Sequence, residues 1–435
     1  MVSGRREVGA LTHHLISFIG AGDYELAHYR FPDWSTAEEA RFFGAALLQY
    51  LRHQVANSSG RHGVDRVVFI GTARSAFNAL PEAFGLRSPA LAGCVSSLRT
   101  AARDGDEGRL RPLLAELAGP LAAHVGLPCE LRVLPDASSS ESQIDAVAVI
   151  VEGILERDRV TLDVTHGLRH LPMLALTAAL LLRHARKAEI AGIWYGALDL
   201  RQGREAAPAV DLAGLLEVAN WVSAFAIYEH SGDFGPFAEC LSDPQMTQAT
   251  EKLREASFLE RAARLVMLPD AIDAFTKAAP SPWPGMAGLF ENSIRKRLED
   301  VAGIDLYRRQ RQLTYLNIRT GDPIRAAVYA YEALITFAAL RKRWNPRDPG
   351  RREQISGLLR TNRSSQQLAS ELGNGRDWAQ TANAIRRLRN AVAHADEAGL
   401  SEGELLWEML TNRATFSERM TAYVELILPK NPNSP

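Results

Sequence analysis

The chain has few cysteines, and those that it has are scattered. Three cysteines, Cys94, Cys129 and Cys240, occur in 435 residues, and no two of them form a CxxC pair. A zinc ribbon and a disulfide framework both need paired cysteines at characteristic spacings, so the sequence argues against both. The same scarcity is typical of a reducing compartment, and we expect a cytoplasmic protein.

The sequence also lacks a long apolar run and an excess of charge. Polar residues interrupt the first stretch, "MVSGRREVGALTHHLISFIG", so we expect no signal peptide. The most apolar run, "LPMLALTAALLL", is too short to cross a bilayer and predicts a buried helix, with no membrane partner. A net charge of -1 excludes a uniformly basic nucleic-acid coat, although it leaves room for a local basic cleft.

What the chain does contain is the composition of a folded protein, with 46% hydrophobic and 23% charged residues. Its length exceeds one ordinary core, which predicts at least two domains. From residue 10 to 210, apolar runs alternate with helical patterns; the runs are "HLISFIG", "DRVVFIG", "CELRVLP", "RVTLDV" and "EIAGIWYGA". Strands that are apolar on both faces and separated by helices indicate a parallel sheet covered on both sides. We therefore predict a Rossmann-like α/β domain here.

Two capping boxes mark helix starts within this domain. Ser35 with Glu38 is expected to open the helix of "TAEEARFFGAALLQYLRH". Ser140 with Gln143 is expected to open the helix of "IDAVAVIVEGILER" in the same way.

Beyond residue 210 the strand patterns fade and helical periods dominate. Proline-rich breaks occur at 280–285, "PSPWPG", and at 345–351, "NPRDPGR". We expect a helical connector over 211–310 and an all-helical C-terminal domain over 311–430.

Polar turns follow three of the predicted strands. In an open parallel sheet, ligands bind beyond the carboxyl ends of the strands, where such turns meet. Glycines let backbone N–H groups approach an anion, and hydroxyl and guanidinium groups donate hydrogen bonds, so phosphate or a nucleotide is the expected ligand. The candidate binding residues are Gly20, Gly22 and Asp23 in the first turn, Gly71, Thr72, Arg74 and Ser75 in the second, and Asp163, Thr165, His166, Gly167 and Arg169 in the third.

Other interpretations of these turns exist. A glycine or threonine at the end of a strand is more often structural than functional, and short glycine motifs are weak signals. His166 and His170 are four residues apart and Asp163 is near, so a metal site is conceivable. No third strong ligand is obvious beside the two histidines, and we expect no metal. Ser75 lacks the G-x-S-x-G spacing of a nucleophile elbow, which argues against a hydrolase of that class.

The segment "LDVTHGLRHLP" resembles the DxTHG signature of CRISPR-associated proteins with a CARF domain, which senses cyclic oligoadenylates in type III immunity. Other blocks of that family resemble "SFIGAGDYELAHYRF", "VVFIGTARSAF", "LPDASSSESQIDAVAVIVEGI" and "GIWYGALDL", in the same order over residues 14 to 200. The loop at 136–142 departs from the family by being rich in serine. The resemblance implies a cyclic oligoadenylate at a dimer axis, the tetra-adenylate ring by family habit, with Thr165 and His166 near phosphate or ribose and Asp163 ordering the turn.

A second constellation lies in "NAIRRLRNAVAHADE", residues 383 to 397. Arg389 and His394 form an R-x4-H pair, and Asn390 follows the arginine. Helical geometry places Arg386, Asn390 and His394 on one face, with Arg389 about 100° away from Asn390. The pair alone is expected about once by chance in this composition, so a surface arginine and a packing histidine are the alternative.

This stretch, with the upstream helix that carries Glu332, resembles the HEPN ribonuclease domain. The resemblance implies an endoribonuclease specific for single-stranded RNA, in which Arg389 holds the phosphate, His394 shuttles the proton and Asn390 positions either. RNA supplies its own 2′-OH nucleophile, so no metal or other cofactor is expected, and the products would carry a 2′,3′-cyclic phosphate and a 5′-OH. Arg389 and His394 are about 140° apart on a helix, so we expect two copies to face each other in a homodimer or a higher homo-oligomer.

Two alternatives stay open. The chain could be a ligand-binding regulator with an inactive helical domain, or a sensor that also cleaves its own cyclic ligand.

Overall fold

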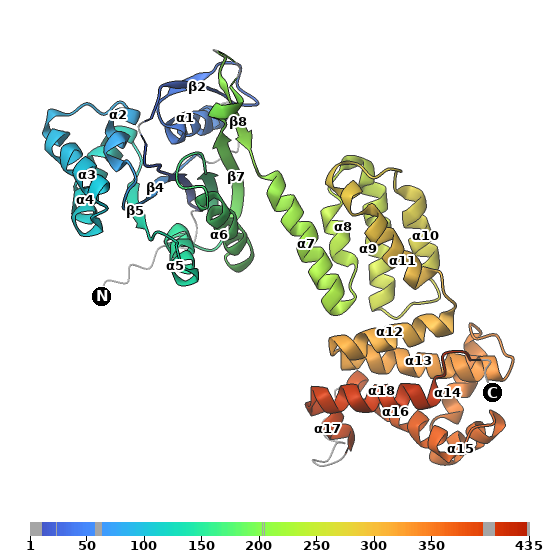
Figure 1. Ribbon diagram of the computed structural model, residues 1–435. Helices are drawn as coiled ribbons and strands as arrows, with labels where there is room; N and C mark the ends of the chain where they lie inside the picture. Colours follow the sequence, from blue (N-terminus) through green and yellow to red (C-terminus); the bar gives the residue numbers. More distant parts are fainter. Residues whose placement is uncertain are drawn as a thin grey trace. The chain divides into compact units, whose positions relative to one another are not determined.

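The computed structural model describes residues 11–22, 24–56, 63–201, 203, 205–394 and 405–432, with only the backbone of His394. The chain divides into two compact units, residues 1–216 and 217–435 (Figure 1). The first unit contains a sheet and the second is helical. The sequence predicts this change from α/β to all-helical structure, and the structure confirms it.

Within the described part of the first unit, eight strands form one sheet in the order β3-β2-β8-β7-β6-β1-β4-β5. The strands are β1 (His13–Phe18), β2 (Ala27–Arg30), β3 (Glu38–Ala40), β4 (Arg66–Thr72), β5 (Cys129–Leu134), β6 (Arg159–Asp163), β7 (Glu189–Gly196) and β8 (Ala207–Asp211). The five strands from β7 to β5 are parallel to one another. The chain builds β1, β4 and β5 outward and then crosses back to place β6 beside β1, so the order reverses between β1 and β6.

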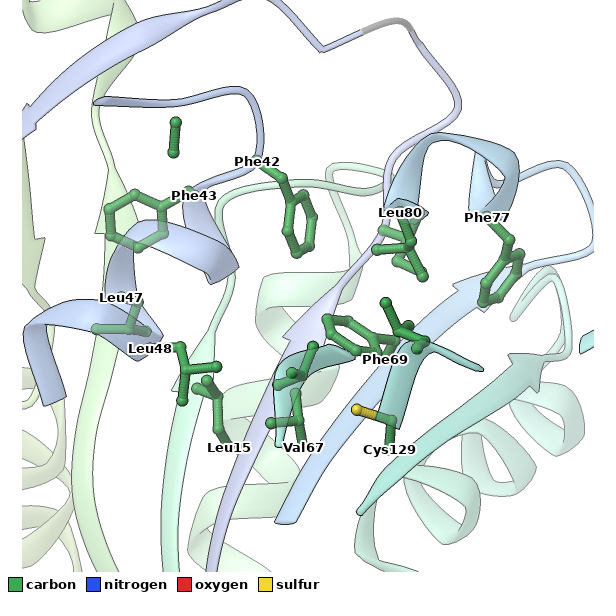
Figure 2. Packing of buried hydrophobic residues seen from close by; sticks show 14 of the residues in the cluster. Leu15, Phe42, Phe43, Leu47, Leu48, Val67, Phe69, Phe77, Leu80 and Cys129 are labelled. Carbon is green, nitrogen blue, oxygen red and sulfur yellow. The ribbon is translucent and has the colours of Figure 1, made fainter. Parts of the chain in front are cut away.

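Helices cover both faces of this sheet. They are α1 (Phe43–Ala56), α2 (Leu80–Ala83), α3 (Ala92–Asp104), α4 (Glu107–Val125), α5 (Ser140–Val151) and α6 (Leu171–Ala185), with a short 3-10 turn η1 (Phe77–Ala79) before α2. Alternate residues of each strand enter opposite cores. Leu15 of β1 packs with Val67 and Phe69 of β4 in the core that α1, α3 and α4 cover (Figure 2), whereas Ile16 packs with Val68 in the core that α5 and α6 cover. Both faces are apolar because both are buried.

The two predicted capping boxes are wrong. Residues 38–40 form strand β3, which pairs with β2, and α1 begins only at Phe43. Strand pairing at the sheet edge thus overrides the local capping signal. For α5 the box lies one residue earlier, with Ser139 as the N-cap and Ser142 as its reciprocal partner.

The apolar run at 171–182 forms α6, but this helix is not buried on all sides. Ala175, Ala178, Ala179 and Leu182 are buried, whereas Met173 is 71% exposed and Leu181 is 45% exposed. The expectation of a buried helix therefore holds for one face only, because α6 packs one side on the sheet and leaves its other side exposed. Among the described helices, none has the length and apolar character needed to span a membrane.

In the second unit, short polar side chains set the starts of several helices. Asp305, Asp322 and Asp348 each accept a hydrogen bond from the backbone N–H three residues later. The helices are α7 (Gly214–Ser231), α8 (Gly235–Cys240), α9 (Thr247–Arg261), α10 (Leu268–Ala278), α11 (Glu291–Ala302), α12 (Leu306–Thr320), α13 (Pro323–Arg341), α14 (Pro349–Leu358), α15 (Asn362–Glu371), α16 (Arg376–His394), α17 (Leu405–Thr411) and α18 (Arg413–Ile427).

Two apolar cores occur in this helical unit. One gathers residues from Trp221 to Tyr329, and the other gathers residues from Tyr307 to Leu428. The predicted boundary at residues 310 and 311 falls inside α12, which contributes to both cores. The division into a connector and a C-terminal domain stays a prediction.

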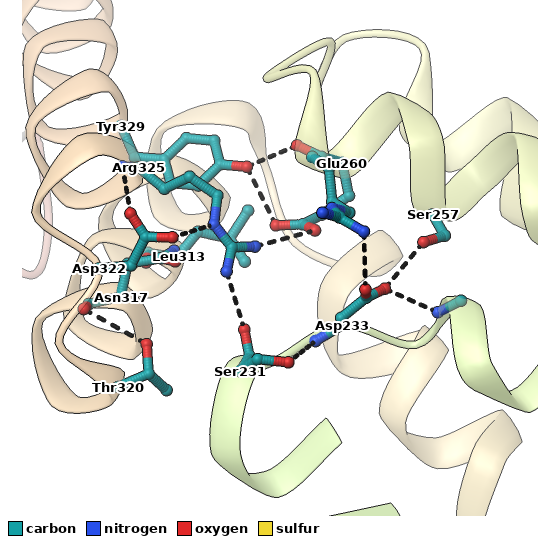
Figure 3. A network of polar contacts seen from close by, with 12 residues as sticks. Ser231, Asp233, Ser257, Glu260, Leu313, Asn317, Thr320, Asp322, Arg325 and Tyr329 are labelled. Carbon is teal, nitrogen blue, oxygen red and sulfur yellow. Dashed lines mark hydrogen bonds and ion pairs between the residues drawn. The ribbon is translucent and has the colours of Figure 1, made fainter. Parts of the chain in front are cut away.

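A polar network joins α9 and α13 with the segment after α7 (Figure 3). Tyr329 Oη donates to the backbone oxygen of Glu260 at 2.5 Å and lies 3.0 Å from its Oε1. Arg325 pairs with Asp322 at 2.7 Å and donates to the backbone oxygen of Ser231 at 3.2 Å. Arg325 Nη1 also lies 3.9 Å from Glu260 Oε2. Because Glu260 is only 2% exposed, this cation and the Tyr329 hydroxyl offset the cost of burying its carboxylate.

Candidate functional site

The turn after β6 begins with a buried carboxylate. Asp163 is 0% exposed, accepts a hydrogen bond from Ser17 Oγ at 2.5 Å and accepts another from the Thr165 N–H at 2.9 Å. Ser17 faces Asp163 because the register of β1 and β6 pairs the two residues. Burial raises the pKa of this carboxyl from 3.8 to about 6, and the hydrogen bonds from Ser17 and Thr165 oppose that rise. Asp163 therefore orders the turn from inside and does not reach solvent.

The next side chains of this turn are anchored to neighbouring elements. The Gly196 N–H at the end of β7 donates to Thr165 Oγ1 at 2.8 Å, and the Phe43 N–H at the start of α1 donates to His166 Nε2 at 3.3 Å. The His166 ring stacks on Phe42 at 5.1 Å between centroids and contacts Tyr24 at 4.7 Å. Burial lowers the pKa of His166 to about 4, so the ring is neutral near pH 7.

Gly167 and Arg169 lie on the outer side of the same turn. Both are exposed, and Gly167 has a φ of +113°, a conformation that a residue with a Cβ adopts only at a cost. A Cβ at this position would also approach the Leu171 side chain to 2.9 Å. The exposed backbone here is open to a ligand.

The turns after β1 and β4 meet beside it. Ser75 is 3% exposed, and its Oγ donates to the Ile19 backbone oxygen at 2.8 Å and accepts from the Thr72 N–H at 2.9 Å. Ser75 thus ties the two turns together from below. Gly71 is buried, whereas Gly20 and Thr72 are partly exposed.

Arg74 and Gly22 are exposed at this edge. The Arg74 guanidinium lies over the end of α3, where its Nη1 donates to the Arg103 backbone oxygen at 3.3 Å. Asp23 lies outside the described residues.

The structure thus gathers the three predicted turns at one edge and separates two roles among their residues. Asp163, Ser75 and the side chains of Thr165 and His166 bind protein groups, while Gly22, Arg74, Gly167 and Arg169 face outward. This edge includes the β1–β6 position where the strand order reverses, which is where ligands of open α/β sheets bind.

Three contributors to this site carry no signal in the sequence. Ser17 belongs to a strand, Tyr24 follows a turn and Gly44 is the second residue of α1. A Cβ on Gly44 would come within 2.4 Å of Ser17 Oγ and 3.1 Å of Asp163 Oδ2, so only glycine allows α1 to start this close to the carboxylate. Such a contact between distant segments appears only in the fold.

The second candidate site lies on α16. Its apolar residues, among them Ala382, Ile385 and Leu388, are buried in the C-terminal core. On its other side, Arg389 Nη1 donates to Asn390 Oδ1 at 3.1 Å, and the Arg389 guanidinium carbon lies 5.5 Å from the centre of the Tyr331 ring of α13. Cation–π contact of this kind fixes a guanidinium plane without occupying all of its donors.

Neighbouring predicted residues have other partners. Arg386 donates to Asn383 Oδ1 at 2.9 Å, and Glu332 pairs with Arg352 of α14. His394 is the last residue of α16, and the structure describes its backbone but not its side chain. The structure therefore brings Arg389 and Asn390 together, and the part of the R-x4-H pair that depends on His394 stays a prediction.

Within the described residues, no group of three histidine, cysteine, aspartate or glutamate side chains is arranged to hold a metal ion. Cys94 and Cys129 are buried and Cys240 is partly buried, and none of these three forms a disulfide bond.

Comparison with known proteins finds similarity that covers most of the first unit. Residues 14–198 match the family described as "CRISPR system endoribonuclease Csx1, CARF domain". CRISPR-associated protein MJ1674 of Methanocaldococcus jannaschii is 21% identical over 266 residues, which are 56% of this chain and 40% of that protein. The chain thus spans about two fifths of that relative's length. These findings support a CRISPR-associated protein whose first unit is a CARF domain linked to ligand sensing.

Proposed function

We propose that this chain is a cyclic oligoadenylate-activated, metal-independent endoribonuclease that cleaves single-stranded RNA in type III CRISPR defence. The observation that carries the proposal is the meeting of three polar turns at the carboxyl edge of a sheet that matches a CARF domain. Exposed backbone at Gly22 and Gly167 and exposed guanidinium groups at Arg74 and Arg169 suit a ligand with several phosphates. Cyclic tetra-adenylate is the favoured ring.

In this proposal the cyclic ligand binds between the two copies of a homodimer. A ring of repeated units suits a two-fold axis, where each protomer contributes the same turns. Apolar side chains of α5 and α6 are exposed in the single chain, with Ile144 at 72% and Met173 at 71%, and a second copy would cover such groups.

The output reaction is assigned to α16. Arg389, held between the Tyr331 ring and Asn390, presents its remaining N–H donors to the scissile phosphate and stabilises the charge of the transition state. His394 moves the proton, and Asn390 holds the arginine. The 2′-OH of the RNA attacks the adjacent phosphorus, and the O5′ leaves with a proton, which yields a 2′,3′-cyclic phosphate and a 5′-OH. Ligand binding activates cleavage only if the ring prefers the active arrangement of the helical units.

Cleavage of the ring by the sensor itself is a less suitable alternative. His166 accepts the Phe43 N–H on Nε2, and its lowered pKa makes it a weak base. Thr165 Oγ1 already accepts the Gly196 N–H. Chromatography of the ring after long incubation tests this alternative, which predicts linear or cyclic-phosphate products. A regulator with an inactive helical unit would instead retard duplex DNA and leave RNA intact.

The decisive experiment is cleavage of a fluorescent RNA in EDTA, with and without cyclic tetra-adenylate or cyclic hexa-adenylate. We expect cleavage only with the activating ring, and a loss of roughly 10²-fold or more in His394→Ala, the scale of a removed general acid–base group. Wild-type rates in His394→Ala would overturn the site, and loss of cleavage in EDTA would overturn the mechanism.

A further inference from the structure

A groove opens beside the three turns, between the starts of α1 and α2 and the middle of α3. Its volume is about 350 Å³, and Tyr24, Arg41, Asn78 and Arg99 contribute its polar groups. Tyr24 links the groove to the turn after β6, because its ring also contacts His166 and its hydroxyl accepts the Gly20 N–H at 3.0 Å. Apart from Tyr24, the groove residues lie outside the three turns that the sequence singles out.

We infer that this groove binds one adenine nucleotide unit of the cyclic ligand. Asn78 would hydrogen-bond to the edge of the base, and Arg99 and Arg41 would bind the adjoining phosphate. The inference rests on the proposed function and adds residues that determine the specificity of that site. Its volume lies at the lower end of the range for small-molecule pockets, which suits a single unit and excludes the whole ring.

The chemistry of the groove matches an adenylate. A carboxamide carries a donor and an acceptor side by side, which is the pair that the N6 and N7 edge of adenine requires. Pro81, Leu86 and Val95 supply an apolar wall for the flat base. Within the described residues, neither the Asn78 amide nor the Arg99 guanidinium has a hydrogen-bond or ion-pair partner, so both are free to bind.

Arg41 is held in place beside them. Its Nη1 donates to the Tyr24 backbone oxygen at 3.2 Å, and its Nε lies 3.4 Å from Glu82 Oε1. Both side chains of this ion pair are exposed, so Glu82 orients the guanidinium while leaving donors for a phosphate oxygen.

The test measures binding of two rings by calorimetry with the full chain. The rings are cyclic tetra-adenylate and cyclic tetra-inosinate, in which the N6 amino group of each base is replaced by a carbonyl oxygen. We expect the wild type to prefer adenine about tenfold or more, as one bidentate base contact implies. Asn78→Leu, similar in size, should lose this preference and bind the adenine ring at least tenfold more weakly.

Matched variants distinguish the loss of a direct contact with the ligand from a general loss of positive charge and from misfolding. Arg99→Gln should weaken binding of both rings alike, whereas Arg157→Gln makes the same change just before β6, at the opposite edge of the sheet, and should bind like the wild type. Thermal unfolding of each variant checks that it folds.

The outcomes distinguish this inference from the proposed function. A wild type that binds neither ring overturns both. A wild type that binds, together with an Asn78→Leu variant that keeps its affinity and its preference for adenine, overturns the groove assignment alone.

Discussion

Asp163→Asn removes a charge from the centre of the sensor site and leaves its shape intact. The folded protein keeps the Asp163 proton up to a pKa of about 6, whereas the unfolded chain releases it near 3.8. The wild type therefore loses stability as the pH rises from about 4 to about 6, because ionisation is favoured in the unfolded state. The asparagine variant has no such dependence.

The magnitude follows from the difference of about two pKa units. Each unit corresponds to about 1.36 kcal/mol, so the ionised carboxylate lowers the free energy of unfolding by about 3 kcal/mol at pH 7. Asparagine keeps both contacts, since its Oδ1 accepts the Thr165 N–H and its Nδ2 donates to Ser17 Oγ. We expect Asp163→Asn to be up to about 3 kcal/mol more stable at pH 7 and equal to the wild type near pH 3.5, if both remain folded there. For a unit of this size that is a rise of roughly 6–12 °C in melting temperature.

Differential scanning calorimetry of both proteins between pH 4.5 and 8 checks this. The difference between the two melting temperatures should grow toward pH 7 and then level off. Because Asp163 is fully buried, the affinity for the cyclic ligand should stay close to that of the wild type. A variant that melts below the wild type by the same amount at every pH would refute the reasoning, since the carboxylate would then be stabilising.

Three further outcomes are expected. His166, with its pKa lowered to about 4, should show imidazole proton resonances that do not titrate between pH 5.5 and 8 in NMR spectra, and the free energy of unfolding should fall as the pH falls from 6.5 toward 4, because the unfolded chain takes up the proton first. Arg389→Lys keeps the charge but loses the planar contact with Tyr331 and the paired donors, so RNA cleavage should fall roughly ten- to hundredfold while ring binding is unchanged in calorimetry. Tyr329→Phe removes the hydroxyl that contacts both Glu260 oxygens; the backbone oxygen keeps the Ala263 N–H as a donor, but the buried Oε1 loses its contact, and urea denaturation should give a free energy of unfolding lower by about 1–3 kcal/mol, with normal ring binding.

The sequence predicts the central strands better than the edge of the sheet. β1, β4 and β6 carry apolar residues on both faces because both faces are buried, and this pattern is visible in the sequence. β3, with the sequence "EEA", has no strand pattern, and its conformation comes from pairing with β2. Similarly, α3 begins with small and polar residues and is fixed by packing on α4, so the sequence gives little sign of it.

The candidate site divides in the same way. The turns after β1, β4 and β6 are predicted because glycine, threonine and charged residues follow apolar runs directly. Ser17 and Tyr24 are not predicted, because their part in the site depends on which strands are neighbours. The β1–β6 pairing joins residues 146 positions apart and is set by the crossover of the chain, which no local pattern records.

Each of the two candidate sites requires a second copy of the chain, for a different reason. On α16, Arg389 and His394 are separated by about 140° around the helix axis, so one helix cannot place both against a single phosphate. At the sensor edge, the proposed function has one set of turns and one groove bind part of a ring whose units repeat. A two-fold axis satisfies both demands, since it pairs the turns around the ring and the R-x4-H motifs around the RNA. On the proposed function, ligand and substrate are each held between two copies of the chain, and a ring that favours one arrangement of the two copies has a direct means of controlling cleavage.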